Sequence, residues 1–230
     1  SIANKLIENH HQVLMVIRDR ELETKAVSDA HLEFATIAGT GLKKSIVGLI
    51  KFGLQFLKGF GQAKSIIARF NPEVILAMGN YLSLPIAIAG RKRKIPVVLH
   101  EQNCLPGKAT KFLAKKAAAI CISFTDSAAY LEIYKSKIVF TGNPIRPEML
   151  VAGTKPRNRQ TSNVLVFGGS QGAHSINLAM VEALDRLESV RTKMTITHLS
   201  GTKDQLLVEK GYQERNFNVS LAPYLNEMHE

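Results

Sequence analysis

A glycine-rich turn is the part of this sequence whose residue types most clearly indicate chemistry. The apolar run Val164–Phe167 has the composition of a buried strand, and Gly168-Gly169-Ser170-Gln171-Gly172 follows it at once. After the turn, apolar residues recur at helical spacing: Ile176, Met180, Val181, Leu184 and Leu187. A strand that turns through glycines into a helix exposes backbone N–H groups at the positive end of that helix. The pattern therefore predicts a phosphate site.

Two common phosphate-binding motifs do not fit this turn. A dinucleotide fingerprint needs glycine where this chain has Ser170, and an acidic residue after the next strand, where this chain has Ser200-Gly201. A P-loop ends in Gly-Lys-Ser or Gly-Lys-Thr, which the turn does not contain. Two alternatives remain: a less common turn for a nucleotide's phosphates, and a plain tight turn without a ligand.

Three further loops share the design of an apolar run followed by small and polar residues. The three loops are Met78–Ser83 after Val74–Ala77, His100–Gly107 after Pro96–Leu99, and Thr141–Arg146 after Ile138–Phe140. In an open parallel sheet, ligands bind in the crevice beyond the carboxyl ends of the strands. We therefore expect the four loops to be parts of one site.

Strand and helix signals alternate along the chain, which predicts an α/β fold with parallel sheets and right-handed crossovers. Strands are expected at 12–17, 74–77, 97–99, 119–123 and 138–140, and helices up to Glu8 and at 84–90 and 108–116. Residues 151–163 are polar and carry no hydrophobic period, as in a linker. We predict two domains, 1–147 and 148–230.

The order and wording of these loops resemble the MurG family. The resemblance rests on Val97–Asn103, Gly142–Arg146 and Gly168–Ala173, and more loosely on Tyr224–Met228. Those enzymes transfer N-acetylglucosamine from UDP-N-acetylglucosamine to undecaprenyl-pyrophosphoryl-muramyl-pentapeptide, a precursor of bacterial peptidoglycan. The resemblance implies a GT-B fold of two facing Rossmann-like domains. Residues 1–147 would form the acceptor and membrane side, and residues 148–230 would form part of the nucleotide-sugar side.

The chain also departs from the family's pattern. The family opens with a strand and a Gly-Gly-x-Gly-Gly-His loop, which nothing before Ser1 supplies, and it continues past Glu230. The resemblance therefore implies a fold that is incomplete at both ends, and the 230-residue piece alone is expected to transfer little sugar. Asn80 stands where the family usually has glycine, and Asn tolerates left-handed backbone angles better than most residues.

The resemblance implies contacts for both substrates. The expected donor-binding residues are Asn103, Arg146, Gly169, Ser170, Gln171, Gly172 and, near the uracil, Leu225. The expected acceptor-binding residues are Tyr81, Ser83, His100, Glu101, Gln102 and Asn103. The N–H groups of the glycine turn and the Arg146 guanidinium would stabilise the negative charge that develops on departing UDP.

Transfer also requires a group that accepts the proton of the acceptor hydroxyl. His100 and Glu101 are the acid–base groups of the matched loops in the N-terminal half, so they are the expected catalytic residues. Two alternatives stay open: His100 as a core histidine bonded to backbone, and the histidine of the family's first glycine loop as the base.

The positive charge is concentrated in the N-terminal half. Residues 1–150 hold 21 Lys and Arg against 11 Asp and Glu, whereas residues 151–230 hold 9 against 8. Lys44, Lys51 and Lys58 lie seven apart in the basic and apolar segment 43–69, and Arg91–Lys94 adds a second cluster. This pattern predicts a peripheral contact with anionic lipid, which the resemblance places on the cytoplasmic face of the membrane. The alternative is a buried helix whose lysines reach solvent.

Other classes of function have less support in the sequence. The net charge of +11 makes nucleic-acid binding a candidate function. However, aromatic residues do not alternate with the basic residues of the two clusters, so no nucleic-acid partner is expected. No cofactor and no catalytic metal are expected, and Cys104 and Cys121 fit reduced thiols. No apolar run reaches the roughly 18 residues that span a bilayer. A non-catalytic remnant that binds a nucleotide-sugar or lipid remains the main alternative.

Overall fold

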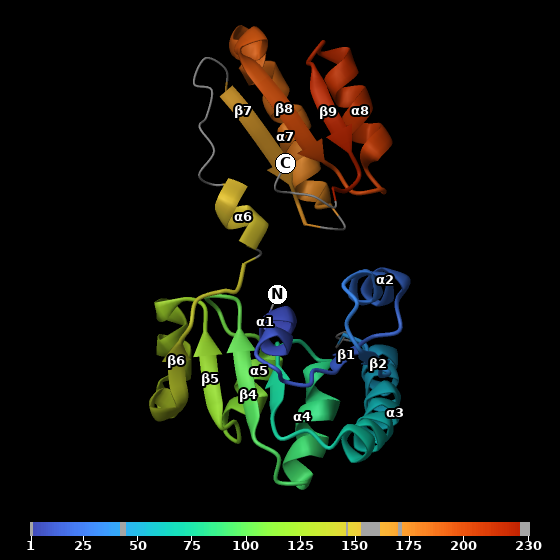
Figure 1. The fold of residues 1–230 in the computed structure, drawn as a ribbon. Coiled ribbons are helices and arrows are strands. Elements are labelled where there is room, and N and C mark those ends of the chain that lie inside the picture. The colour runs from blue at the N-terminus through green and yellow to red at the C-terminus, as the bar shows by residue number, and fades with distance from the viewer. Residues whose placement is uncertain (1, 42–44, 146, 153–161, 170–171, 226–230) are drawn as a thin grey trace. The chain divides into compact units, whose positions relative to one another are not determined.

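The computed structural model describes residues 2–41, 45–145, 147–152, 162–169 and 172–225. The chain divides into two compact units, unit 1 (Ser1–Pro144) and unit 2 (Ile145–Glu230) (Figure 1). Each unit contains parallel strands that alternate with helices, so the predicted α/β class with parallel sheets is confirmed. No helix within the described residues is long and apolar enough to span a bilayer.

Unit 1 is built on two parallel sheets. In the smaller sheet, β1 (Met15–Ile17) pairs with β2 (Phe34–Thr36). The larger sheet has the order β3 (Ile75–Ala77), β4 (Val97–Glu101), β5 (Ala119–Ile122) and β6 (Ile138–Phe140). The helical segments are α1 (Ile2–Glu8), α2 (Glu21–Asp29), α3 (Ile46–Phe70), α4 (Ser83–Lys92), α5 (Lys108–Ala114) and the 3₁₀ segment η1 (Thr125–Lys137).

Strand β4 lies inside the larger sheet and is apolar for that reason. Val97 and Leu99 are each 2% exposed, and each residue of the strand is either buried or, like Val98, partly buried. Strands that are covered on both faces read as continuous apolar runs, which explains why the sequence marks this strand so clearly. Its last residues, His100 and Glu101, lie at the carboxyl edge of the sheet next to the ends of β3 and β5.

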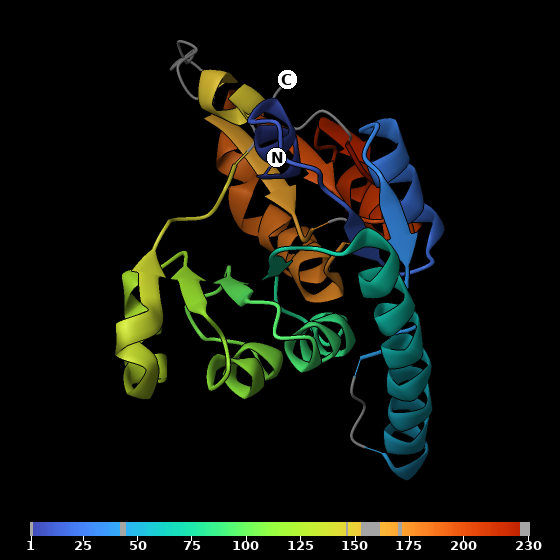
Figure 2. The same cartoon turned by 60° about the horizontal axis from the view of Figure 1, so that its bottom comes forward.

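Helix α3 is continuous despite its glycines (Figure 2). The hydroxyl of Ser45 caps its start by accepting a hydrogen bond of 3.1 Å from the N–H of Gly48. Asn71 ends it in the left-handed region, with φ 48°. A Cβ atom at Gly59 would overlap the carbonyl oxygen of Ala38, so this glycine allows the helix to pack directly against the loop after β2.

Unit 2 contains one parallel sheet, in which β7 (Ser162–Phe167), β8 (Met194–Leu199) and β9 (Val219–Ala222) lie side by side (Figure 1). Its helical segments are α6 (Pro147–Ala152), α7 (His174–Leu187), the 3₁₀ segment η2 (Glu188–Lys193) and α8 (Gln205–Glu214). Leu184 on α7 and Val208 on α8 are fully buried against Ile196 of the sheet. Met180, Leu184 and Leu187 of the apolar period therefore form the core-facing stripe of α7, whereas Ile176, at its start, is 42% exposed.

Several elements were not predicted, and one strand is shorter than expected. The unpredicted elements are α2, β2, η1, α6 and η2, and β1 begins at Met15 rather than at residue 12. Each of these strands has three residues, which is too short for an alternating pattern to stand out. Most of the predicted linker 151–163 lies outside the described residues.

Candidate functional site

The glycine turn of unit 2 has a backbone that requires glycine at defined positions. Gly169 and Gly172 have φ of +81° and +71°, and the N–H of Gly172 donates to the carbonyl of Gly169 at 3.0 Å. A Cβ atom at Gly168 would overlap Ala173, and one at Gly172 would overlap the carbonyl of Ser200. Ser170 and Gln171, which were expected to contact the donor, lie outside the described residues.

Helix α7 follows this turn directly. Ala173 occupies the N-cap position with extended backbone angles, and its side chain has no oxygen that could accept from the first amides. The positive end of a 14-residue helix thus lies immediately beyond the turn. This is the arrangement that binds an anion through backbone N–H groups.

The three loops at the carboxyl edge of unit 2 are joined to one another. Gly172 lies against the carbonyl of Ser200 after β8. The N–H groups of Ser200 and Gly201 donate to the carbonyls of Ala222 and Pro223 after β9, both at 3.1 Å. Leu225, the residue expected near the uracil, is on the third of these loops and is 37% exposed. The structure therefore brings the turn and the Leu225 loop to one edge of the sheet.

His100, at the end of β4, is 3% exposed and has a partner at each ring nitrogen. Its Nε2 lies 3.2 Å from the carbonyl of Gly142, and its Nδ1 lies 3.0 Å from the side-chain nitrogen of Gln102. An amide nitrogen only donates, so Nδ1 accepts and Nε2 carries the proton that goes to Gly142. The ring therefore ties β4 to the loop after β6.

Glu101 is 2% exposed and uses both carboxylate oxygens to hold the loop after β4. Oε1 accepts from the backbone and side-chain N–H groups of Asn103, at 3.1 and 3.0 Å. Oε2 accepts from Gly107 N–H at 3.0 Å and from the Thr110 hydroxyl at 2.6 Å. Burial acts to raise the pKa of Glu101, but these hydrogen bonds outweigh it and the pKa is lowered.

These contacts bear on the catalytic role expected for His100 and Glu101. Their acceptor positions are occupied by donors from the protein, so neither side chain has a lone pair directed at a substrate hydroxyl. The role of proton acceptor stays a prediction, and the geometry favours a positioning role for both residues. For His100, this is the core-histidine alternative.

The remaining acceptor-side candidates surround the same edge of unit 1. Asn103 is exposed, and Gln102 links two loops because its amide also donates to the carbonyl of Met78 at 3.1 Å. The hydroxyl of Ser83 donates to the carbonyl of Gly79, so it closes the turn before α4. The ring of Tyr81 packs edge-on against Phe52, with 5.5 Å between centroids.

Asn80 and Arg146 complete the residues that the sequence singled out in these loops. Asn80 has φ 62°, and its side-chain oxygen accepts from the N–H of Leu82 at 2.7 Å, so the expected left-handed conformation is confirmed. Arg146 lies outside the described residues.

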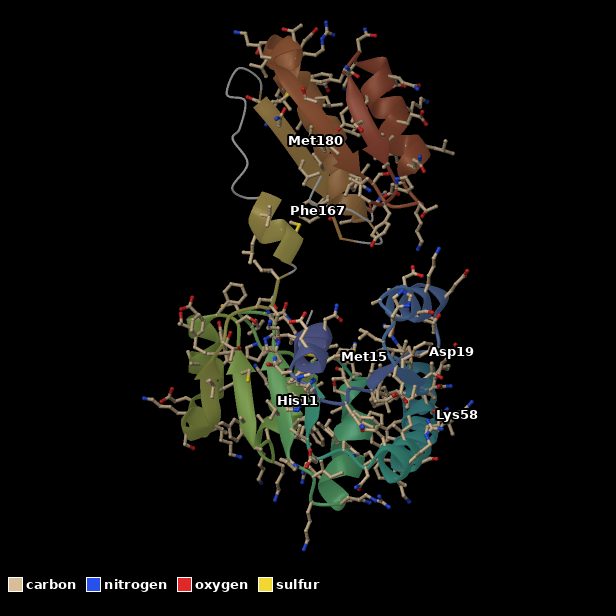
Figure 3. The ribbon with its side chains drawn as sticks, viewed as in Figure 1. His11, Met15, Asp19, Lys58, Phe167 and Met180 are labelled. Carbon is tan, nitrogen blue, oxygen red and sulfur yellow. The ribbon has the colours of Figure 1, made fainter. Side chains whose placement is uncertain are left out.

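A separate basic cavity lies at the carboxyl ends of β1 and β2. It has a volume of about 260 Å³, and Figure 3 shows Asp19 and Lys58 on the side of unit 1 where they line it. Arg18 and Arg20 also line the cavity, and Arg18 is paired with Glu23 at 2.8 Å. No pattern noted in the sequence identifies this cavity.

Among the described residues, no group of three or more His, Cys, Asp or Glu side chains is placed to hold a metal ion.

Helix α3 presents two apolar faces. Phe52, Phe56 and Phe60 pack against the core of unit 1. A second stripe is exposed to solvent and consists of Ile46 (79% exposed), Ile50 (59%), Leu54 (64%) and Leu57 (66%). These exposures exclude the alternative of a fully buried helix. We call this stripe, with the neighbouring exposed Lys51 and Lys58, the α3 surface.

Basic residues also gather near the second half of α3. Lys92, within the Arg91–Lys94 cluster that ends α4, lies with its ammonium 5.1 Å from the ring of Phe60. The ammonium of Lys64 lies 6.0 Å from the same ring. The second basic cluster predicted from the sequence is therefore beside α3, whereas Lys43 and Lys44 lie outside the described residues.

Two family profiles match the chain. That of the glycosyltransferase family 28 N-terminal domain covers residues 1–122, and that of the family 28 C-terminal domain covers residues 163–230. A curated relative from Geotalea uraniireducens (strain Rf4) is 33% identical over an alignment of 235 positions, which covers 99% of this chain and 64% of the relative. That relative is a UDP-N-acetylglucosamine--N-acetylmuramyl-(pentapeptide) pyrophosphoryl-undecaprenol N-acetylglucosamine transferase. The chain spans less than two thirds of the length of such relatives.

Solved structures share the fold. MurG from Acinetobacter baumannii superposes with a TM-score of 0.66 at 22% identity, over 99% of this chain and 62% of that one. UDP-GlcNAc 2-epimerase from Neisseria meningitidis, solved with UDP-GlcNAc bound, has a TM-score of 0.62 at 15% identity, over 96% of this chain and 68% of that one. At these identities the likeness shows the fold alone, and it confirms the expected GT-B type with Rossmann-like domains.

Proposed function

The chain belongs to glycosyltransferase family 28, and on that premise we propose that it acts in the transfer of N-acetylglucosamine from UDP-N-acetylglucosamine to lipid-linked N-acetylmuramyl-pentapeptide. In this reaction the acceptor hydroxyl attacks the anomeric carbon with inversion, and UDP leaves with a developing negative charge. The observation that carries the proposal is the turn Gly168–Gly172, with its two positive φ angles at the start of α7.

Unit 2 supplies the donor side in this proposal. The N–H groups in the first turn of α7, at the positive end of that helix, stabilise the charge that develops on the diphosphate. Ser170 and Gln171 add donors from the glycine turn, Leu225 packs near the uracil, and Arg146 pairs with a phosphate oxygen. The N–H groups of α7 belong to the backbone of a helix, so they are already oriented before the reaction starts.

Unit 1 supplies the acceptor side. The loops after β3, β4 and β6 lie at the same edge of its sheet. Hydrogen bonds of His100 and Gln102 connect these three loops to one another. Asn103 and Tyr81 are proposed to contact the acceptor sugar and its pyrophosphate from this edge. We assign Glu101 to positioning, since its four hydrogen bonds fix the backbone that presents Asn103.

The α3 surface is proposed to rest on the membrane that carries the lipid-linked acceptor. Its exposed apolar stripe is bordered by Lys51 and Lys58, and Arg91–Lys94 adds positive charge nearby. Buried apolar area and attraction to anionic headgroups together favour an interfacial location. The protein is therefore proposed to be peripheral, on the cytoplasmic face, where nucleotide-sugars are available.

Equilibrium binding of radiolabelled UDP-N-acetylglucosamine tests this assignment. We expect saturable binding that unlabelled UDP competes away and that ADP displaces far less well. RNA of mixed sequence serves as the control for the net positive charge. Salt-sensitive RNA binding that UDP-N-acetylglucosamine leaves unchanged, together with no binding of the sugar nucleotide, would contradict the proposal.

A further inference from the structure

A chain of buried polar groups runs through the core of unit 2 towards the glycine turn. Asn177 on α7 and His198 on β8 are both 0% exposed, and Tyr212 on α8 is 1% exposed. The Tyr212 hydroxyl lies 3.0 Å from Nδ1 of His198, and Nε2 of His198 lies 3.0 Å from Oδ1 of Asn177. The Asn177 side-chain nitrogen lies 2.8 Å from the carbonyl of Ser200 and 2.8 Å from a carboxylate oxygen of Asp204.

These contacts determine where each proton lies. The nitrogen of Asn177 faces two acceptors, so its oxygen must face His198, and an amide oxygen only accepts. His198 is therefore the tautomer with a proton on Nε2, and its Nδ1 accepts from the Tyr212 hydroxyl. Burial lowers the pKa of His198 and raises the pKa of Tyr212 to about 12, which keeps both groups neutral at pH 7.

The chain of hydrogen bonds ends on the atom that supports the turn. Ser200 is 1% exposed, and its carbonyl oxygen is the group that a Cβ atom at Gly172 would overlap. The Asn177 amide donates to that same oxygen, from the first turn of the helix that follows the glycine turn. The orientation of one buried amide thus sets the surface against which Gly172 lies.

We propose that Asn177 and His198 are positioning residues for the donor's diphosphate. His198 fixes the orientation of the Asn177 amide, Asn177 fixes the Ser200 carbonyl, and this carbonyl sets the position of Gly172, from which the chain enters α7. The N–H groups at the start of α7 are the ones that meet the phosphates. The inference rests on the proposed function and extends it to residues that do not touch the donor. Apolar residues of similar volume stabilise a core about as well as a buried polar chain, whereas a satisfied chain specifies one orientation.

The test compares the affinities of variants of this chain for UDP and for uridine by calorimetry. Asn177→Ala removes the amide. The matched control, Val208→Ala, truncates a residue of α8 that is also 0% exposed but that belongs to the apolar core of unit 2 and has no polar side-chain group. Both variants lose core packing, so a general loss of stability appears in both. A loss of affinity that acts through the glycine turn appears only in Asn177→Ala, and only for UDP, because uridine has no phosphates.

We expect Asn177→Ala to weaken UDP binding about tenfold or more, equivalent to about 1.4 kcal/mol, and to leave uridine binding within about twofold of wild type. Val208→Ala should keep the wild-type ratio of the two affinities. Equal UDP affinity in the two variants would overturn the positioning role while leaving the donor assignment intact. A wild-type chain that binds UDP no better than uridine would overturn the donor assignment as well.

A second measurement does not depend on how well a variant folds. Nitrogen-15 NMR of the wild-type chain reports the tautomer of each histidine, and we expect the proton of His198 on Nε2 at pH 7. A proton on Nδ1 would break the inferred order of donors and acceptors, and it would overturn the proposal even if Asn177→Ala could not be purified.

Discussion

The carboxylate of Glu101 accepts a hydrogen bond of 2.6 Å from the hydroxyl of Thr110, on the first turn of α5. The same oxygen accepts from Gly107 N–H at 3.0 Å, and the other oxygen accepts twice from Asn103. One buried side chain therefore holds the loop after β4 at both of its ends. This explains how a carboxylate can be buried at the end of a strand, since four donors replace its water.

Replacing Glu101 with Ala should destabilise unit 1 by roughly 3 kcal/mol, because the donors it satisfies are left without their acceptor in a buried site. Urea denaturation followed by circular dichroism measures the loss. Hydrogen exchange should quicken at the amides of Asn103 and Gly107. The control is Glu73→Ala, at an exposed position, with an expected change within about 0.5 kcal/mol. An equal loss of unfolding free energy in the two variants would show that Glu101 does not stabilise the loop after β4.

The stability of unit 2 should fall as the solution becomes mildly acidic, because burial lowers the pKa of His198 from 6.5. The unfolded chain then binds the proton more tightly than the folded chain, so the contribution is present above about pH 6.5 and is lost below it. The slope is at most about 1.4 kcal/mol per pH unit for one proton. Thermal unfolding from pH 7.5 to 5.5 should show this slope in the wild type and not in His198→Gln. The same slope in both would assign the effect to another group.

Gly172→Ala should disturb the turn, because the new methyl group would overlap the Ser200 carbonyl and alanine is strained at φ +71°. We expect a loss of roughly 2 kcal/mol in stability and weaker UDP binding. Gly61→Ala is the matched control, since a Cβ atom there meets nothing within 4 Å. Alanine inside helix α3 should add roughly 0.5–1 kcal/mol. Unchanged UDP affinity in Gly172→Ala would show that the turn does not need this backbone.

The parallel pairing of the strands follows from their alternation with helices. The strand Val97–Glu101 stands out in the sequence because most of its residues are buried, whereas other strands expose apolar residues, among them Leu165 and Phe167 of β7. The resemblance to MurG is confirmed by the curated relatives. Glycine disfavours helices, whereas the structure places Gly59 within α3 and uses it to bring that helix against Ala38.

The site was predicted less completely than the fold. Sequence order identifies His100 and Glu101 as a polar pair after a strand, but it does not show that protein donors occupy both. The role of Asn177 depends on a contact with His198, 21 residues away, which no local pattern contains. A histidine within an apolar strand was the available signal, since a buried polar side chain requires partners.

The α3 surface should control binding to vesicles that contain anionic lipid. Changing both Ile50 and Leu54 to Glu removes apolar area and adds negative charge, so binding should weaken about tenfold or more. The control is Leu206→Glu, at a residue of unit 2 that is 81% exposed. Co-sedimentation with vesicles measures both variants. If Leu206→Glu loses as much vesicle binding as the double variant, the effect is not specific to α3. If the double variant binds vesicles as well as the wild type does, α3 is not part of the membrane interface.

The most direct test is a proton–nitrogen NMR titration of the chain with UDP-N-acetylglucosamine. It locates the ligand without relying on a substitution. We predict that the largest and saturable shifts occur at the amides of Gly169 and Gly172, with smaller shifts near Leu225. The basic cavity of unit 1 is the competing site for an anion, and Ala38 and Gly39 report on it. Shifts confined to Ala38 and Gly39, with none at the glycine turn, would contradict the assignment of the donor site to unit 2.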